Sequence, residues 1–210
     1  MSISTQAPLW LGEAPLVLAS KSAARRAMLE AAGLHPQIMS VDVDERALEE
    51  GFLLDGGHPI KLAAALAEAK ALAASRTRPH AYCLGADQTL ALGDHLLHKP
   101  RDLAEAARSL ARLAGREHRL TSAFAIARSG KTLAVDADHA DLFMRALDRK
   151  TIALYLELAG PAVLSSVGGY QLEGLGVHLF DRIKGDFATI LGLPIFKLLH
   201  WLRRERLISL

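Results

Sequence analysis

The sequence predicts a single α/β domain with a mixed, twisted sheet flanked by helices. Half of its 210 residues are hydrophobic, which is enough for a sizeable core. Strand-like apolar runs alternate with helical segments, and some strand-like runs also follow one another directly, as in hairpins, which favours a mixed sheet over a purely parallel one. Neither a repeat nor a low-complexity linker divides the sequence. We therefore assign residues 1–15 to an N-terminal extension and residues 16–210 to one domain.

The first half of the chain alternates between strands and helices. Short apolar runs identify the strands, whereas stripes of alanine and leucine at helical spacing identify the helices. Ser20 or Ser22 can cap the first helix, and Gly33 ends it. The predicted elements are a strand over 16–19, a helix over 23–32, a strand over 38–43, a helix over 59–75 and a buried strand that ends at 87.

The second half contains hairpins as well as helices. Gly93 and Asp94 mark a hairpin turn, Asp102 and Asp148 can cap helices, and Pro194 can open the last helix. The predicted elements are a hairpin over 90–97, a helix to about 114, strands over 120–128 and 132–144, a helix over 150–158, a strand over 177–183 and a helix over 195–204.

The composition argues against several classes of protein. A net charge of +2 and 5% aromatic residues provide neither the basic surface nor the stacking platforms of a nucleic-acid binder. Cys83 is the single cysteine, so an internal disulfide is impossible. Secretory leader features are absent from the first residues, and no apolar stretch reaches the roughly 18 residues that span a bilayer. We therefore expect a cytoplasmic protein with no nucleic-acid or membrane partner.

Hydroxyl and guanidinium groups gather at the start of the first predicted helix. The turn between a strand and a helix exposes backbone N–H groups that suit an anion, and Ser20, Arg25 and Arg26 add further donors. The turn is therefore a candidate phosphate site. The alternative is an N-cap followed by two solvated arginines, which is the commoner outcome for such a string taken alone.

Two groups of carboxylates are candidates for metal binding or proton transfer. Asp42, Asp44 and Glu45 cluster at the end of a predicted strand and suit a hard cation such as Mg²⁺, unless they simply form a polar loop. Asp87 follows a buried strand, where chemistry often gathers in α/β proteins, and Lys99 lies twelve residues further on. The alternative for Asp87 is structural capping of the next turn.

Lys70 and a glycine-rich segment complete the candidate set. Lys70 could reach a phosphate, or it could stand in solvent near the end of its helix, where positive charge is favoured. Residues 168–176 are dense in glycine, which allows a ligand to approach closely, but they do not fit the G-x-G-x-x-G pattern of dinucleotide folds. Together, anion donors, acidic metal ligands and a glycine-lined pocket are what phosphoanhydride cleavage with a divalent metal needs.

The order of these segments resembles the Maf family of nucleoside-triphosphate pyrophosphatases. The opening turn is similar to the family's L-A-S-x-S-P-R-R motif, and later segments resemble its V-D-E, K-A, G-A-D, K-P, G-Y, Q-G-x-G and G-L-P elements. In this chain the matching segments are residues 18–26, 43–45, 69–71, 85–87, 99–100, 169–170, 173–176 and 192–194. The resemblance covers roughly residues 16–204, nearly the whole chain.

The resemblance implies hydrolysis between the α and β phosphates of a nucleoside triphosphate, which yields the monophosphate and pyrophosphate. It also implies an elongated mixed sheet akin to that of the inosine-triphosphate pyrophosphatases, a cytoplasmic homodimer and a Mg²⁺ or Mn²⁺ cofactor. The family's proton acceptor matches Asp87. The other site residues that we predict are Lys70 and Lys99 for catalysis, Ser20, Arg25 and Arg26 for substrate binding, and Glu45 with Asp87 for the metal.

Three positions match those that set base specificity in the family, namely Ala24, Gln88 and Glu173. The pair Gln88 and Glu173 resembles that of the subfamily that prefers 7-methyl-GTP. This preference has a physical reason, because a carboxylate can accept hydrogen bonds from both N1–H and the 2-amino group of guanine. We therefore predict a pyrophosphatase for 7-methyl-GTP or a related modified purine nucleotide, active in sanitising the nucleotide pool. The alternatives are a dTTP/UTP or broad-range pyrophosphatase of the same family, or a nucleotide-binding regulator of septum formation.

Overall fold

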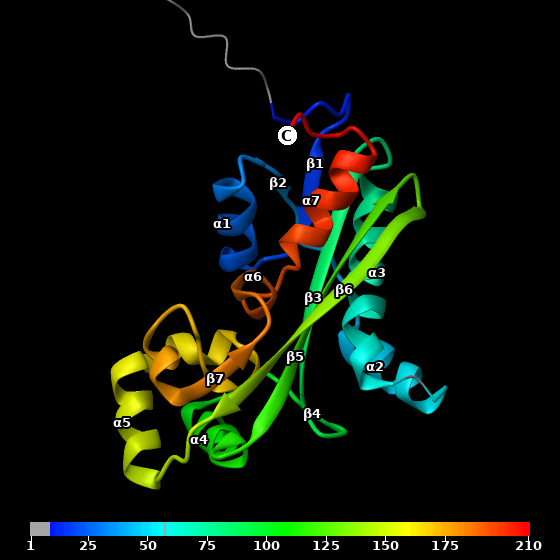
Figure 1. Cartoon of the computed structure of the whole chain (residues 1–210). Helices are drawn as coiled ribbons and strands as arrows, with labels where there is room; N and C mark the ends of the chain where they lie inside the picture. The colour runs from blue at the N-terminus through cyan, green and yellow to red at the C-terminus, as the bar shows by residue number, and fades with distance from the viewer. Residues whose placement is uncertain (1–8, 57) are drawn as a thin grey trace, which may run out of the picture.

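Three long antiparallel strands form the backbone of the fold (Figure 1). A computed structural model describes residues 9–56 and 58–210 of the chain. The strand order is β2-β1-β3-β5-β6-β7, and β4 also pairs with β3. The strands are β1 (Leu16–Ala19), β2 (Gln37–Ile38), β3 (Tyr82–Leu92), β4 (His95–Leu97), β5 (Glu117–Arg128), β6 (Lys131–Met144) and β7 (Phe180–Lys184). Since β1 runs parallel to β2 and β3 while the other pairs are antiparallel, the predicted mixed α/β sheet is confirmed.

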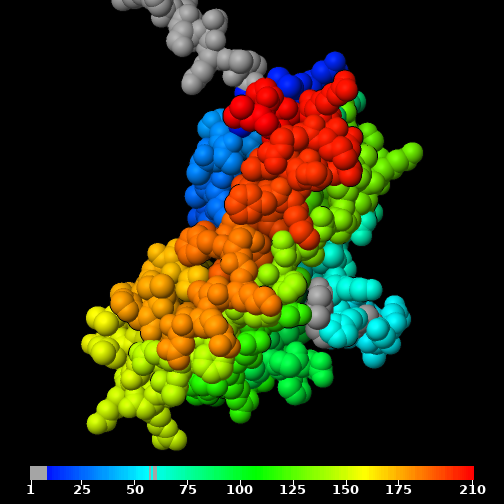
Figure 2. Space-filling model, in the orientation of Figure 1, coloured from blue at the N-terminus to red at the C-terminus, as the bar shows by residue number. Residues whose placement is uncertain are grey.

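Helices flank both faces of this sheet. In Figure 1, α3 lies on one face and α1, α6 and α7 lie on the other, and in Figure 2 α6 and α7 cover much of the visible face. The helices are α1 (Ala23–Ala31), α2 (Glu45–Leu54), α3 (Pro59–Thr77), α4 (Leu103–Leu113), α5 (Arg149–Ala159), α6 (Phe187–Ile190) and α7 (Ile195–Arg204). Three 3₁₀ segments lie between α5 and β7: η1 (Gly160–Ser165), η2 (Val167–Gly169) and η3 (Leu175–Leu179). Asp102 and Asp148 cap α4 and α5, as predicted.

The side chains of β5 alternate between two hydrophobic clusters, one on each face of the sheet. Ala123, Ala125 and Ala127 pack with alanines of α3. Phe124 and Ile126 point to the opposite face and pack with leucines of α1 and α7. This alternation follows from the two-residue period of a strand. Small residues therefore line the α3 face, and large residues line the other.

The alanine layer brings α3 unusually close to β3. A Cβ atom built on Gly85 would stand 2.1 Å from the carbonyl oxygen of Ala67 and 2.6 Å from the backbone nitrogen of Ala71. No side chain fits between the strand and the helix at this point. Gly85 thus fixes the distance at which the following residues of β3 meet α3.

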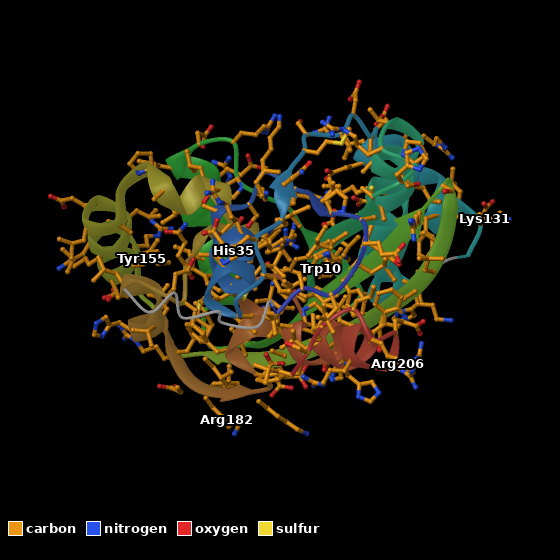
Figure 3. The ribbon with its side chains drawn as sticks, turned by 90° about the horizontal axis from the view of Figure 1, so that it is seen from above. Trp10, His35, Lys131, Tyr155, Arg182 and Arg206 are labelled. Atoms are coloured by element: carbon orange, nitrogen blue, oxygen red, sulfur yellow. The ribbon has the colours of Figure 1, made fainter. Side chains whose placement is uncertain are left out.

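A second core lies at the other end of the long strands. Leu90, Leu120 and Leu142 pack there with residues of α4, α5 and the 3₁₀ segments. The molecule is consequently elongated, with Tyr155 of α5 and Lys131 of β6 at opposite sides in the view from above (Figure 3). The two ends share β3, β5 and β6, so the chain forms one continuous sheet.

The described part of the N-terminal segment packs against the C-terminus. Trp10 forms an isolated antiparallel bridge with Ile208, and Leu11 N–H donates to the carbonyl of Leu207 at 2.8 Å. The division at residue 15 stays a prediction, and residues 1–8 of the proposed extension lie outside the described residues. Across the described ranges, no helix is both long and apolar enough to cross a bilayer.

Several predicted element boundaries were wrong. The strand over 38–43 is reduced to β2, because the chain leaves the sheet after Met39 donates to Leu18 and turns toward α2. α2 itself was not predicted, and none of its residues is buried. The strand expected to end at 87 continues to 92, because β5 pairs with it along nearly its whole length. The strand expected over 177–183 begins only at Phe180, after η3.

The close contact at Gly85 predicts that adding a single methyl group there destabilises the fold. We expect Gly85→Ala to lower the free energy of unfolding by about 3 kcal/mol, because overpacking against helix backbone must displace α3 or β3. Gly51→Ala is the matched control: its Cβ would meet nothing within 4 Å, and alanine favours a helix by about 0.5–1 kcal/mol. Denaturant unfolding of both variants checks this, and equal stabilities would contradict it.

Candidate active site

A gap in the edge of β3 defines the site. β5 pairs with one edge of β3 from Cys83 to Ala91. On the opposite edge, β1 pairs with β3 only as far as Gly85, and β4 pairs with it only from Leu90 onward. Residues 86–89 therefore present a free strand edge between two neighbouring strands. Asp87 was expected at the end of its own strand; it lies instead mid-strand, where the neighbouring strand ends.

A cavity of about 1190 Å³ opens at this gap. Its walls come from the turn after β1, from α2 and α3, from the segment after β4 and from the glycine-rich segment. Nine of the predicted site residues line it: Ser20, Ala24, Arg25, Glu45, Lys70, Asp87, Gln88, Lys99 and Glu173. The structure thus brings together residues that the sequence spreads over more than 150 positions.

Arg26 is the predicted site residue that does not line the cavity. Its Nε donates to Glu30 at 2.7 Å on the exposed side of α1. The Arg26 side chain is directed along α1 toward Glu30, one helical turn further on, and not toward the cavity. In this structure Arg26 is therefore a solvated arginine, which was the alternative to a phosphate-binding role.

Lys70 joins the two predicted metal ligands. Its Nζ forms an ion pair with Asp87 Oδ2 and a second one, at 2.7 Å, with Glu45 Oε1. Lys70 lies in α3 between Ala67 and Ala71, the two residues that contact Gly85, and Asp87 follows Gly85 on the same face of β3. Asp87 is 7% exposed, and its other oxygen accepts from the backbone N–H of Gln88 at 2.6 Å. Both carboxylate oxygens of Asp87 thus have a donor.

Arg25 is held by three donated hydrogen bonds. Nη1 donates to the carbonyl of Ala86 at 2.8 Å and to Ser20 Oγ at 3.2 Å, and Nε donates to the carbonyl of Gly192 at 2.7 Å. Burial lowers the pKa of Arg25 below its usual value, against the opposing effect of the Asp87 and Glu45 charges. The guanidinium is thus a fixed cation at the free edge of β3.

The turn before α1 has the geometry expected of an anion site. Ser22 caps α1 by accepting from the backbone N–H of Arg25 at 3.3 Å, and Ser20 Oγ accepts from Ser22 N–H at 3.2 Å. Residues 19–25 all line the cavity. Lys99 also lines it, and its ammonium has no hydrogen bond or ion pair with any other described residue. Because the Ser22 and Arg25 N–H groups already donate to serine hydroxyls, Lys99 and the other N–H groups of the turn are the donors available to an incoming phosphate.

The cavity carries no net charge. Six lysine or arginine side chains and six aspartate or glutamate side chains line it. A polyphosphate brings several negative charges into this neutral space, so its binding is favoured when a cation accompanies it.

The carboxylates fit a metal only in part. Within residues 9–56 and 58–210, no three histidine, cysteine, aspartate or glutamate side chains gather to hold an ion. Glu45 and Asp87 nevertheless converge on one ammonium group. Two carboxylates completed by water and substrate phosphates are a usual ligand set for Mg²⁺. The residues therefore fit an ion that arrives with a phosphorylated substrate.

Gln88 faces the opposite side of β3 from Asp87. A Cβ on Gly168 would stand 2.7 Å from Leu90 Cδ1, which places the glycine-rich segment over the face that Leu90 and Gln88 share. Gln88 Nε2 donates to the carbonyls of Thr189 and Ile190. The strand thus presents the Asp87 carboxylate on the face toward α3 and the Gln88 amide on the other, and both residues line the cavity.

A buried aromatic cluster anchors the glycine-rich segment. Tyr170 Oη lies 2.8 Å from His118 Nε2, and the rings of Tyr170, His118 and Phe180 pack at centroid distances between 4.9 and 5.8 Å. Burial raises the pKa of Tyr170 and lowers that of His118 to about 4. The cluster holds a neutral histidine under the segment that carries Glu173, which is itself exposed and lines the cavity.

The sequence did not identify the groups that position the site residues. The Gly192 carbonyl orients Arg25, and Ser122 and Thr189 contact Gln88. One signal was available: Ser122 is a polar residue within an apolar strand. Its role becomes evident only once the register places it opposite Gln88.

Comparisons with known proteins agree with this geometry. The family model described as Maf-like protein matches residues 15–205. A protein of Rhodopseudomonas palustris (strain BisB18) named nucleoside triphosphate pyrophosphatase is 50% identical over 201 residues, which cover 96% of this chain and 98% of the relative. A protein of Brucella abortus biovar 1 (strain 9-941) named 7-methyl-GTP pyrophosphatase is 48% identical over 194 residues, covering 92% and 98%. A protein of Rhizobium etli (strain ATCC 51251 / DSM 11541 / JCM 21823 / NBRC 15573 / CFN 42), also named 7-methyl-GTP pyrophosphatase, is 47% identical over 188 residues, which cover 90% of this chain and 94% of the relative.

The buried His118 predicts a pH-dependent stability. Because its pKa is about 4 in the folded protein and 6.5 in the reference state, the unfolded chain binds the proton more readily between these values. Protonation of His118 in the unfolded chain should by itself lower the free energy of unfolding by about 2 kcal/mol from pH 7 to pH 5. His118→Gln keeps a group that can bond to Tyr170 but does not titrate, so denaturant unfolding should show a smaller loss. Equal losses in both proteins would contradict this.

Proposed function

Because the chain belongs to the Maf family, we propose that its cavity binds a nucleoside triphosphate and hydrolyses the bond between the α and β phosphates. The products are the nucleoside monophosphate and pyrophosphate. The observation that carries this proposal is the convergence of Arg25, Lys70 and Lys99 on the cavity that holds Asp87. The relatives named nucleoside triphosphate pyrophosphatase, at about half identity over nearly the whole chain, support it.

The triphosphate is held at the gap in the edge of β3. Ser20 and the N–H groups of the turn before α1 donate to phosphate oxygens, and Arg25 and Lys99 neutralise their charge. Charge builds up on the leaving pyrophosphate as the α–β bond breaks. Positioned cations that are already oriented stabilise this charge without further reorganisation.

Asp87 is the group that orients or deprotonates the attacking water. Its two oxygens are fixed by Lys70 and by the N–H of Gln88, and each retains acceptor capacity. A carboxylate held in this manner at the α phosphate directs water toward phosphorus. Lys70 pairs with Asp87 and also lines the cavity, where it can donate to a phosphate.

Glu45 and Asp87 would hold a divalent cation, Mg²⁺ or Mn²⁺. When bound, such an ion supplies charge neutralisation for the phosphates. The convergence of the two carboxylates and the zero net charge of the cavity support this cofactor. Lys70 lies between the two carboxylates, and it would have to leave this position for both of them to hold such an ion.

Glu173 reads the base, and the preferred substrate is 7-methyl-GTP or a related modified purine nucleotide. The carboxylate accepts from two adjacent donors of a guanine edge and favours the positive charge of a methylated ring. It repels the carbonyl groups of uracil. Ala24 offers only a methyl group to the cavity, so discrimination falls to Glu173 and Gln88. The two relatives named 7-methyl-GTP pyrophosphatase support this assignment.

Nucleotide-pool sanitation, dimerisation and a cytoplasmic location stay predictions of the sequence. A panel of triphosphates that includes 7-methyl-GTP, UTP and dTTP, with pyrophosphate release measured in Mg²⁺ or Mn²⁺, tests the activity. Release from none of them would favour a nucleotide-binding regulator instead.

The assignment of Asp87 predicts the outcome of a one-atom change. We expect Asp87→Asn to lower kcat by a factor of about 10²–10⁴, because the amide cannot accept a proton. The variant should remain folded, which a thermal unfolding transition will show. Asp94→Asn, in the exposed β3–β4 turn, is the control and should retain wild-type turnover. Near-normal turnover of Asp87→Asn would overturn the assignment.

The assignment of Glu173 predicts a change in preference. We expect Glu173→Gln to lower the ratio of kcat/KM for 7-methyl-GTP to that for UTP about tenfold, because the amide loses the charge that favours one base and repels the other. Glu157→Gln, on the exposed side of α5, is the control. An unchanged ratio in the Glu173 variant would show that another group reads the base.

A further inference from the structure

The Gln88 side chain is fixed by partners that the reaction does not use. Its Nε2 lies 2.8 Å from the carbonyl oxygen of Ile190, 3.2 Å from that of Thr189 and 3.0 Å from Ser122 Oγ. Ser122 and Thr189 are fully buried, at 0% exposure. Water therefore cannot replace these contacts, and the amide is held by protein alone.

The direction of these hydrogen bonds fixes the orientation of the amide. The two carbonyls can only accept. Ser122 donates its own hydrogen to the carbonyl of Thr189 at 2.6 Å, so its oxygen is left to accept from Gln88. A flipped amide would set Oε1 against two carbonyl oxygens. The NH₂ group of Gln88 therefore donates to the carbonyls of α6, and Oε1 points away from them.

The two α6 carbonyls that accept from Gln88 are themselves held in place by further hydrogen bonds. Asp186 caps α6 by accepting from the backbone N–H of Thr189 at 2.8 Å, and its other oxygen accepts from Thr189 Oγ1. The segment that follows is tied to the site by Arg25, which donates to Gly192. The carbonyls that accept from Gln88 therefore cannot easily turn away.

We propose that Gln88 presents only a hydrogen-bond acceptor to the substrate, and that Ser122 is a positioning residue that holds it so together with the two α6 carbonyls. The inference rests on the proposed function and deepens it. Gln88 Oε1 and the Glu173 carboxylate then form a base-reading surface without donors. Such a surface selects a base edge that carries N–H groups, as in a guanine nucleotide, and rejects one dominated by carbonyl oxygens.

Ser122→Ala tests the positioning role. Without the hydroxyl, Gln88 loses its one acceptor on β5 and is held by the two α6 carbonyls alone. The side chain can then move as a whole, which brings its NH₂ group nearer to the cavity. We expect the ratio of kcat/KM for 7-methyl-GTP to that for UTP to fall about tenfold, chiefly through improved use of UTP. Ser75→Ala is the matched control, because it deletes a fully buried serine hydroxyl that bonds to Leu72 and Gly130, away from the cavity. It should lower stability while leaving the ratio unchanged.

A second variant keeps the inference testable if Ser122→Ala does not fold. Gln88→Leu removes the acceptor, so it should lower kcat/KM for 7-methyl-GTP about tenfold without lowering that for UTP. Loss confined to UTP would show that the NH₂ group reads the base and would overturn the inference. So would a Ser122→Ala ratio equal to that of Ser75→Ala. Absence of pyrophosphate release from every triphosphate by the wild-type protein would instead overturn the proposed function.

Discussion

The approach of α3 to β3 at Gly85 sets the geometry of the site. Because no side chain separates the strand from the helix at this point, backbone atoms of Ala67 and Ala71 lie where a Cβ of residue 85 would stand. Lys70 on the same helix thereby reaches Asp87, two residues further along the strand. The alanine layer on β5 extends the same thin packing across the sheet. A bulkier layer would move the ammonium away from both carboxylates.

The free edge of β3 adds the second constraint. Since the pairing of β1 with β3 stops at Gly85 and that of β4 with β3 begins at Leu90, four residues of a central strand face a cavity instead of another strand. The alternation of side chains then assigns Asp87 to the α3 face and Gln88 to the face of the glycine-rich segment. One short segment of strand thus places phosphate chemistry and base recognition on opposite faces of one opening.

The sequence predicted the local parts of this arrangement and missed the parts that depend on distant contacts. The turn around Ser20 and Arg25 is a continuous segment with a cap, so its geometry follows from local rules. The hydrogen bonds from Gln88 to Ile190 and from Arg25 to Gly192 join residues more than 100 positions apart, and no local pattern encodes them. α2 was not predicted and buries none of its residues, yet it supplies Glu45 to the cavity.

A crystal structure with a triphosphate analogue that has a non-hydrolysable α–β linkage, together with Mn²⁺, is the most direct test. We expect the α phosphate to lie in the gap at residues 86–89 beside Asp87, with Lys70 withdrawn from between Glu45 and Asp87. We expect the base to lie against Gln88 Oε1 and Glu173. An analogue bound outside this gap, or with its base against the turn before α1, would contradict the assignment of the site.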